Sequence, residues 1–189
     1  MKKIIITAHP SSKGFTHQIA KNFKKGAEAG KHGVEILDLY HSDFLQNFLQ
    51  FKSVKELSFD EKREYFQNKI KEADELVFIF PIWWGTCPAV MKNFFDSNFT
   101  SGFAYLMGDR GIEKLLKGKG ARIFATCDGP SLLYSFSLSP TKITWKYFML
   151  GFCGVRLKSF VIFGRMFKQG ENVRKKWLDR IYEMGKSSK

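Results

Sequence analysis

Residues 73–96 of the chain read ADELVFIFPIWWGTCPAVMKNFFD. The run at residues 75–80 is almost wholly apolar, which is typical of a strand buried on both faces of a parallel sheet. Two adjacent tryptophans follow this run. Pro88 then favours the start of a helix, because a first helical turn does not need the N–H that proline lacks. The segment therefore predicts a strand, a loop and a helix.

The two tryptophans of this loop are not expected to face the core together. Adjacent residues on an extended backbone point to opposite sides, so at most one of Trp83 and Trp84 should fill the interior. The other indole is left for a ligand or a partner, and rings held between Pro81 and Pro88 suit a flat ligand. The alternative is that both indoles fill the core.

Four other apolar runs alternate with stretches of helical character. The expected strands are residues 3–7, 34–38, 75–80, 121–126 and 159–163, and the expected helices are residues 15–29, 60–72, 88 onward, 141–152 and 172–185. Such alternation predicts an α/β fold of three layers, with helices on both faces of a five-stranded parallel sheet. Right-handed crossovers make the sheet doubly wound, and the common strand order is 2-1-3-4-5.

No internal repeat or linker divides the chain, so residues 1–189 are expected to form a single domain. The phenylalanine-rich stretch at residues 40–66 is expected to supply a lid or an interface loop. The tail at residues 186–189 is expected to fray.

The charge balance is strongly basic, with a formal net charge of +13 and a pI near 9.7. The lysines lie mainly in short runs on expected helices and turns, without an arginine-rich tract or a nucleic-acid-binding motif. A solvated basic surface is therefore the main interpretation, and no nucleic-acid partner is expected. Capture of a dinucleotide's phosphates is the other interpretation of this charge.

The apolar stretches are too short or too interrupted to span a bilayer, so an integral membrane protein is not expected. The first apolar run ends at His9 and Pro10, with no room for a signal-peptide core, and a cytoplasmic location follows. Cys87, Cys127 and Cys153 are odd in number and form no Cys-x-x-Cys pair. Neither a disulfide nor a metal site is therefore expected.

Two unusual loops should meet where a ligand binds in this kind of sheet, beyond the carboxyl ends of the first and third strands. The loop at residues 8–17 offers hydroxyl groups, His9, Gly14 and the start of a helix, where Thr16 and backbone N–H groups suit a phosphate. The tryptophan loop offers a flat apolar wall. A ligand with a phosphate at one end and a planar ring at the other satisfies both loops, and a flavin has that form.

Two other nucleotide sites are natural competitors of a flavin site. A Rossmann nicotinamide site needs Gly-x-Gly-x-x-Gly after the first strand, where this chain has Pro10, and no P-loop is present either. A third loop follows the fourth strand at residues 126–134. Gly129 and Pro130 form a turn there, whose backbone could meet the polar rim of a flavin ring, and Tyr134 could reach the substrate side.

These residues resemble the NAD(P)H quinone oxidoreductase family of flavodoxin-like flavoproteins over nearly the whole chain. His9-Pro10 followed by Gly14-Phe15-Thr16 resembles the family's phosphate loop, with Gly14 where serine is usual. The sequence at residues 81–96 resembles the family's Pro-x-x-Trp flavin loop and the helix after it, and residues 100–105 resemble its aromatic stretch beyond that helix.

The resemblance implies a set of cofactor-binding residues: at the phosphate His9, Gly14, Phe15, Thr16 and His17; along the ring Pro81, Ile82, Trp83, Trp84 and Gly85; and at its polar edge Thr126, Cys127, Asp128 and Gly129. Tyr134 matches the family's catalytic tyrosine. Two residues depart from the family pattern. Asp128 stands where glycine is frequent, and Pro140 stands where the quinone reductases carry the histidine of their proton relay.

The implied function is a flavin-dependent NAD(P)H oxidoreductase that passes two electrons by way of flavin N5 to quinones, azo compounds or nitro compounds. FMN and FAD both remain open as the cofactor, as do NADH and NADPH as the co-substrate. A homodimer is implied as well, with residues 40–66 at its interface. The alternative is a flavin-binding regulatory or electron-carrier subunit without quinone turnover, and a third possibility is a scaffold that has lost its flavin.

Overall fold

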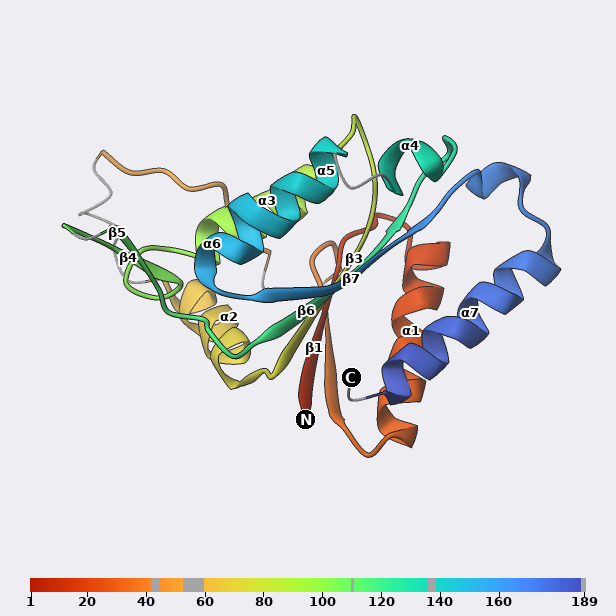
Figure 1. Ribbon diagram of the computed structural model, residues 1–189, viewed down its shortest axis with the longest axis horizontal. Helices are drawn as coiled ribbons and strands as arrows, with labels where there is room; N and C mark the ends of the chain where they lie inside the picture. Colours follow the sequence, from red (N-terminus) through yellow and green to blue (C-terminus); the bar gives the residue numbers. More distant parts are fainter. Residues whose placement is uncertain (42–44, 53–59, 110, 136–138, 188–189) are drawn as a thin grey trace.

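The computed structural model describes residues 1–41, 45–52, 60–109, 111–135 and 139–187. Its centre is a parallel sheet with the order β2-β1-β3-β6-β7 (Figure 1). The strands are β1 (Lys2–Thr7), β2 (Gly33–Asp38), β3 (Glu75–Pro81), β6 (Gly120–Thr126) and β7 (Arg156–Phe163). Counted along the chain as five strands, this is the predicted order 2-1-3-4-5, so the expected α/β fold class is confirmed.

Helices cover both faces of the sheet, so the fold has three layers, with the sheet between two layers of helices (Figure 1). One face carries α1 (Phe15–Ala29) and α7 (Glu171–Lys186). The other carries α2 (Glu61–Glu72) and α3 (Ala89–Asn98) together with the helical segment described below. Every residue of β3 and β6 is buried, because these central strands have helices on both sides.

Helices α1 and α7 approach each other closely because glycines stand at their contact. A Cβ atom built on Gly26 would lie 2.0 Å from the Tyr182 carbonyl oxygen, and one built on Gly185 would lie 2.3 Å from the Phe23 carbonyl oxygen. Neither distance is possible for a real side chain, so any larger residue would force the helices apart. This packing fixes the second half of α7 against the second half of α1.

The helix expected at residues 141–152 is composite in the structure. It begins as α5 (Pro140–Ile143), continues as a π-helix over Thr144–Leu150 and ends as α6 (Gly151–Cys153). Trp145 of this segment is buried against Phe80, with the ring centroids 5.2 Å apart and nearly stacked. The short helix α4 (Leu132–Ser135) precedes it.

Three local predictions need correction. Pro88 is the N-cap of α3 rather than part of its first turn, with ψ at 152°. The antiparallel pair β4 (Tyr105–Gly108) and β5 (Gly111–Lys114) was not predicted, because its mostly exposed residues lack the apolar alternation of a buried strand. The tail does not fray through Ser187, whose carbonyl oxygen accepts a hydrogen bond of 2.8 Å from the Lys3 ammonium group.

The phenylalanine-rich stretch is only partly described. Phe66 is buried on α2, whereas Phe48 and Phe51 are exposed. Phe44 and Phe59 lie outside the described residues. No helix in the described ranges has the length and apolar character needed to cross a membrane.

A buried group of charges lies at the amino edge of the sheet. The Glu75 carboxylate is within 3.0 Å of Arg122 Nε and Lys158 Nζ, and 3.4 Å from Lys3 Nζ. Burial raises the pKa of Glu75, but Arg122, Lys158 and Lys3 outweigh that effect and hold it below the usual value. Burial lowers the pKa of Lys3, which Glu75 only partly offsets.

Candidate active site

Three loops are held side by side at the carboxyl edge of the sheet. Beyond the strand ends, the Ala8 N–H donates to the Ile79 oxygen at 3.0 Å and the Ile82 N–H donates to the Thr126 oxygen at 2.7 Å. The Cys127 N–H likewise donates to the Phe163 oxygen at 2.9 Å. The loops that follow β1, β3 and β6 therefore start in register, and they enclose a cavity of about 320 Å³.

The cavity brings together residues from all three loops and from the chain after β7. The predicted residues among its lining are His9, Phe15, Thr16, Pro81, Ile82, Trp83, Thr126, Cys127 and Asp128, and the lining residues that were not predicted are Met166, Phe167 and Arg174. The other predicted residues do not line it: Gly14, His17, Trp84, Gly85, Gly129 and Tyr134. The lining combines the basic side chain of Arg174 and the start of α1 with apolar side chains such as Trp83, Ile82 and Phe167, and it also includes Asp128.

The start of α1 forms the basic end of the cavity. Gly14 is its N-cap, and no side chain caps the free N–H groups of the first turn. A Cβ atom at Gly14 would lie 2.9 Å from His9 Cε1, which explains why glycine stands here instead of the family's serine. The backbone of Ser11 donates to His9 Nδ1 at 3.0 Å and so holds the ring beside the loop.

Arg174 of α7 is the most informative residue that sequence reasoning missed. Its Nη2 donates to the Met166 oxygen at 2.6 Å, and its guanidinium lies 6.0 Å from the centre of the Phe15 ring. Its Nε atom is buried without a hydrogen-bond partner among the described residues. A buried donor without an acceptor is costly, so a ligand oxygen would complete this site. The sequence showed only a basic run on a surface helix.

The tryptophan loop is a tight turn, not an extended segment. The N–H groups and carbonyl oxygens of Trp83 and Thr86 are joined by two hydrogen bonds, of 2.9 and 3.0 Å. Trp84 and Gly85 between them have φ values of 51° and 77°, as in a type I′ turn. Both indoles therefore stay outside the core: Trp83 lines the cavity and is 43% exposed, whereas Trp84 is fully exposed at the tip. The assumption of an extended backbone was therefore wrong, although the expectation that at most one indole fills the core agrees with the structure.

The loop after β6 is pinned to the chain that follows β7. The Arg165 N–H donates to the Gly129 oxygen at 3.0 Å, and the Met166 N–H donates to the Cys127 oxygen at 3.2 Å. Burial raises the pKa of the Cys127 thiol, and the neighbouring Asp128 carboxylate raises it further. Cys127 is thus a neutral thiol in the cavity wall at physiological pH.

Tyr134 does not line the cavity. It is half-buried, and a Cβ atom built on the neighbouring Gly129 would be 3.8 Å from its ring.

His17 also differs from its predicted place at the phosphate. Its Nε2 lies 2.8 Å from Asp38 Oδ2, and the same oxygen lies 3.0 Å from His41 Nδ1. Burial raises the pKa of Asp38, but hydrogen bonds from His17, the Tyr40 N–H and His41 outweigh it and lower the pKa overall. His17 is buried, and its Nδ1 has no partner among the described residues.

A cavity at the carboxyl edge of a doubly wound sheet, with a free helix N-terminus at one end, is the arrangement of a flavodoxin-like site. The family model described as flavodoxin-like fold matches residues 1–183. The chain belongs to this flavodoxin-like family.

Individual flavodoxin-like relatives extend this result. The structure of Smu.1420 from Streptococcus mutans is 31% identical, with a TM-score of 0.83 over 98% of this chain and 99% of that chain. The NAD(P)H:quinone oxidoreductase from Methanothermobacter marburgensis is 25% identical, with a TM-score of 0.82 over 98% and 96% of the two chains. An FMN-dependent NADH:quinone oxidoreductase of Clostridium beijerinckii is 29% identical over 180 residues, covering 89% of this chain and 87% of that protein.

The match to some other curated relatives is shorter, and the chain covers only 30% to 60% of their length. The activity and substrates of those whole proteins are therefore considered only as proposals for this chain.

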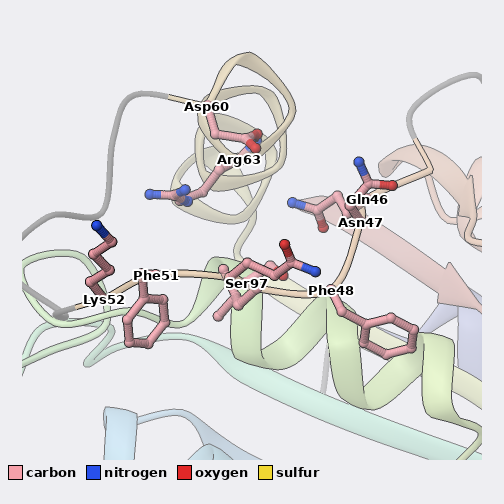
Figure 2. A pocket seen from close by; sticks show the side chains of 10 residues that line it. Gln46, Asn47, Phe48, Phe51, Lys52, Asp60, Arg63 and Ser97 are labelled. Atoms are coloured by element: carbon pink, nitrogen blue, oxygen red, sulfur yellow. The ribbon is translucent and has the colours of Figure 1, made fainter.

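Of the larger hollows that lie away from the carboxyl edge of the sheet, two adjoin α3. Figure 2 shows the first, of about 560 Å³, where Asp60 and Arg63 at the start of α2 face residues 46–52 and Ser97 of α3. The second, of about 750 Å³, lies beside Phe95, Phe99 and Phe148. Neither is lined by any of the predicted site residues, so size alone does not locate the active site.

Proposed function

We propose that the cavity of about 320 Å³ holds FMN and that the protein is an FMN-dependent NAD(P)H oxidoreductase with quinone-like acceptors. The observation that carries the proposal is the pairing of a basic end with an apolar wall in one cavity at the carboxyl edge. The chemistry of the lining fits both ends of FMN, since the N-terminus of α1 and Arg174 suit a phosphate while Trp83 and Ile82 suit a flat ring.

Each group of lining residues has a separate task in this proposal. The free N–H groups of α1 and the guanidinium of Arg174 hold the phosphate, and Thr16 adds a hydroxyl group beside them. Trp83 and Ile82 cover the ring and exclude water from it. The chain at residues 126–128, which lines the cavity, would meet the polar edge of the ring.

The cofactor, when bound, supplies hydride acceptance at N5 and two-electron transfer. The chain orients the ring and leaves one of its faces accessible to NAD(P)H and then to the acceptor. Tyr134 is proposed to polarise or protonate the acceptor, which requires the loop after β6 to move, because Tyr134 does not line the cavity in this structure. Pro140 cannot donate a proton, so a histidine relay has no part in this mechanism.

The acceptor class is a quinone, an azo compound or a nitro compound. Two relatives support the quinone, since proteins named as quinone oxidoreductases match this chain at 25% and 29% identity. The Clostridium beijerinckii relative also supports FMN over FAD, because its name specifies FMN.

A single titration tests the proposed function. The purified protein is saturated with FMN, reduced with NADH or NADPH without oxygen, and then mixed with menadione. Bleaching by the nicotinamide and return of the yellow colour with menadione are the expected results. Colour that neither nicotinamide bleaches would favour an electron carrier, and failure to take up any flavin would favour a scaffold that has lost it.

Three further assignments belong to the proposal. One sheet is shared by both helical layers, which supports a single domain over residues 1–189. Exposed apolar side chains such as Phe148, at 70%, and Met107, at 71%, support a homodimer, which analytical ultracentrifugation would test. The free thiols of Cys87, Cys127 and Cys153 support a cytoplasmic location.

A further inference from the structure

Three side chains that the proposed FMN site does not use meet beside its basic end. His17 comes from the first turn of α1, Asp38 is the last residue of β2, and His41 lies three residues further on. The nearest ring nitrogens of the two histidines and a carboxylate oxygen of Asp38 all lie within 4.8 Å of one another. Only the fold brings this group together, because the two histidines are 24 positions apart in the sequence and this spacing does not indicate a metal site.

The hydrogen-bond partners of His41 conflict with a neutral ring. Its Nε2 lies 2.9 Å from the Pro10 carbonyl oxygen, and its Nδ1 lies 3.0 Å from Asp38 Oδ2. A carbonyl and an ionised carboxylate only accept hydrogen bonds, whereas a neutral imidazole carries one N–H. One contact therefore brings two lone pairs together unless a positive species stands between them. That species is either a second proton or a metal ion.

The surroundings of His41 and Asp38 match those of metal ligands. A histidine that binds a metal usually donates its other ring N–H to a carbonyl or a carboxylate, and the Pro10 oxygen accepts from His41 in this way. The Tyr40 N–H donates to Asp38 Oδ1 at 3.1 Å, which turns Oδ2 towards both rings. Nδ1 of His41 and Oδ2 of Asp38 are thus held facing a common point.

We infer that His17 Nε2, Asp38 Oδ2 and His41 Nδ1 form a binding site for one divalent transition-metal ion such as Zn²⁺. Two imidazole nitrogens and one carboxylate oxygen suit zinc and its neighbours rather than magnesium or calcium. Three protein ligands leave a fourth position for water, as in open zinc sites. The bound ion would tie the Pro10 loop, the start of α1 and the end of β2 together.

Metal binding requires the two histidine rings to shift. Ligand atoms around a tetrahedral zinc ion lie about 3.3 Å apart, given Zn–N distances of about 2.0–2.1 Å. The contacts at Asp38 are 2.8 and 3.0 Å, and the two histidine nitrogens lie within 4.8 Å of each other, so the rings must move slightly away from Asp38 and swing towards one another by up to about 1.5 Å. The His41 ring is 39% exposed, which leaves it free to move and gives the ion a path of entry.

The test uses the full chain freed of flavin, so that it does not depend on the proposed FMN site. Co²⁺ is added as a visible probe, and Zn²⁺ is then added to displace it. We expect one Co²⁺ per chain with the visible absorption of a tetrahedral site, full displacement by Zn²⁺, and a higher midpoint of thermal unfolding when Zn²⁺ is present.

Substitutions of the proposed ligands show which side chains bind the ion. His41→Gln and Asp38→Asn should each weaken Zn²⁺ affinity about tenfold or more, by loss of a ligand or of its charge. His32→Gln is the matched control, because His32 lies elsewhere with its Nε2 3.3 Å from the Lys186 oxygen, and it should bind Zn²⁺ as the unmodified chain does. His41 is exposed, so its replacement should leave the fold intact, and circular dichroism checks this.

Three results would overturn the inference: absence of a tetrahedral cobalt spectrum in the folded chain, equal loss of affinity in His32→Gln and His41→Gln, or an intense thiolate-to-cobalt band that assigns the ion to cysteine. FMN uptake with any of these results would leave the proposed function standing. Zn²⁺ binding without FMN uptake would support the metal site and contradict the proposed function.

Discussion

The two edges of the central sheet differ in the partners that their buried charged side chains have. At the amino edge, the Glu75 carboxylate meets three cations, and the Lys3 ammonium group also donates to two backbone oxygens. At the carboxyl edge, Arg174 Nε has no partner among the described residues, and no side chain caps α1. The chain itself supplies the counter-charges of Glu75, whereas the Arg174 donor without a partner belongs to a residue that lines the cavity, where the proposed function places the FMN phosphate.

The largest predicted change is a loss of folding stability when the buried carboxylate at the amino edge is removed. Glu75→Gln removes the one carboxylate among three buried cations and should lower the free energy of unfolding by about 3–5 kcal/mol, with FMN affinity unchanged in the folded protein. Urea denaturation measures it, and Glu72→Gln, in an exposed ion pair with Lys2, is the control that should change little. An equally stable Glu75→Gln protein would show that this edge does not hold the fold.

The same carboxylate gives a pH dependence. The pKa of Glu75 is held below its usual value, so its stabilising effect is complete above the unfolded pKa of about 4.3 and is lost as the pH falls through the lower folded value. The difference in stability between the unmodified chain and Glu75→Gln should therefore shrink on acidification below about pH 4. A difference that stays constant down to pH 2 would contradict this assignment.

The next largest predicted change is a loss of FMN affinity when Arg174 at the carboxyl edge is replaced. Arg174→Leu should weaken FMN binding roughly 10- to 100-fold, since a hydrogen bond to a charged group is worth about 1.5–3 kcal/mol. Riboflavin, which lacks the phosphate, should be much less affected in the same fluorescence titration. Arg180→Leu, at an exposed position on the same helix, is the control. Equal losses for FMN and riboflavin would place the guanidinium away from the phosphate.

A smaller effect separates the two tryptophans. Trp83→Ala should weaken both FMN and riboflavin roughly 3- to 10-fold, because an aromatic contact contributes about 0.5–1.5 kcal/mol beyond its buried area. Trp84→Ala should leave both affinities unchanged, since the Trp84 indole lies outside the cavity. The reverse order would mean that the turn rearranges around the flavin.

The smallest effect concerns backbone strain in the same turn. Trp84 has a left-handed φ of 51° and a fully exposed side chain. Trp84→Gly should therefore raise the free energy of unfolding by about 1 kcal/mol without loss of a packing contact. A less stable variant would show that a second subunit covers this indole, and sedimentation of the two proteins would reveal that contact.

The sequence predicted the sheet well because its strands are long apolar runs in regular alternation with helices. It located the carboxyl-edge loops for the same reason, and nine of the predicted residues line one cavity there. Arg174 escaped prediction because a basic residue on a surface helix gives no sign that α7 folds back over Phe15. Trp84 was expected along the ring but does not line the cavity, because a Trp-Gly turn with two positive φ values was treated as an extended strand end.

Titration of the folded, flavin-free chain with FMN tests the central claim most directly. We predict saturation at one FMN per chain, quenching of flavin fluorescence, and clearly tighter binding of FMN than of riboflavin. A protein that is folded by circular dichroism and quenches neither ligand, or that binds riboflavin as tightly as FMN, would contradict a cofactor site at the carboxyl edge.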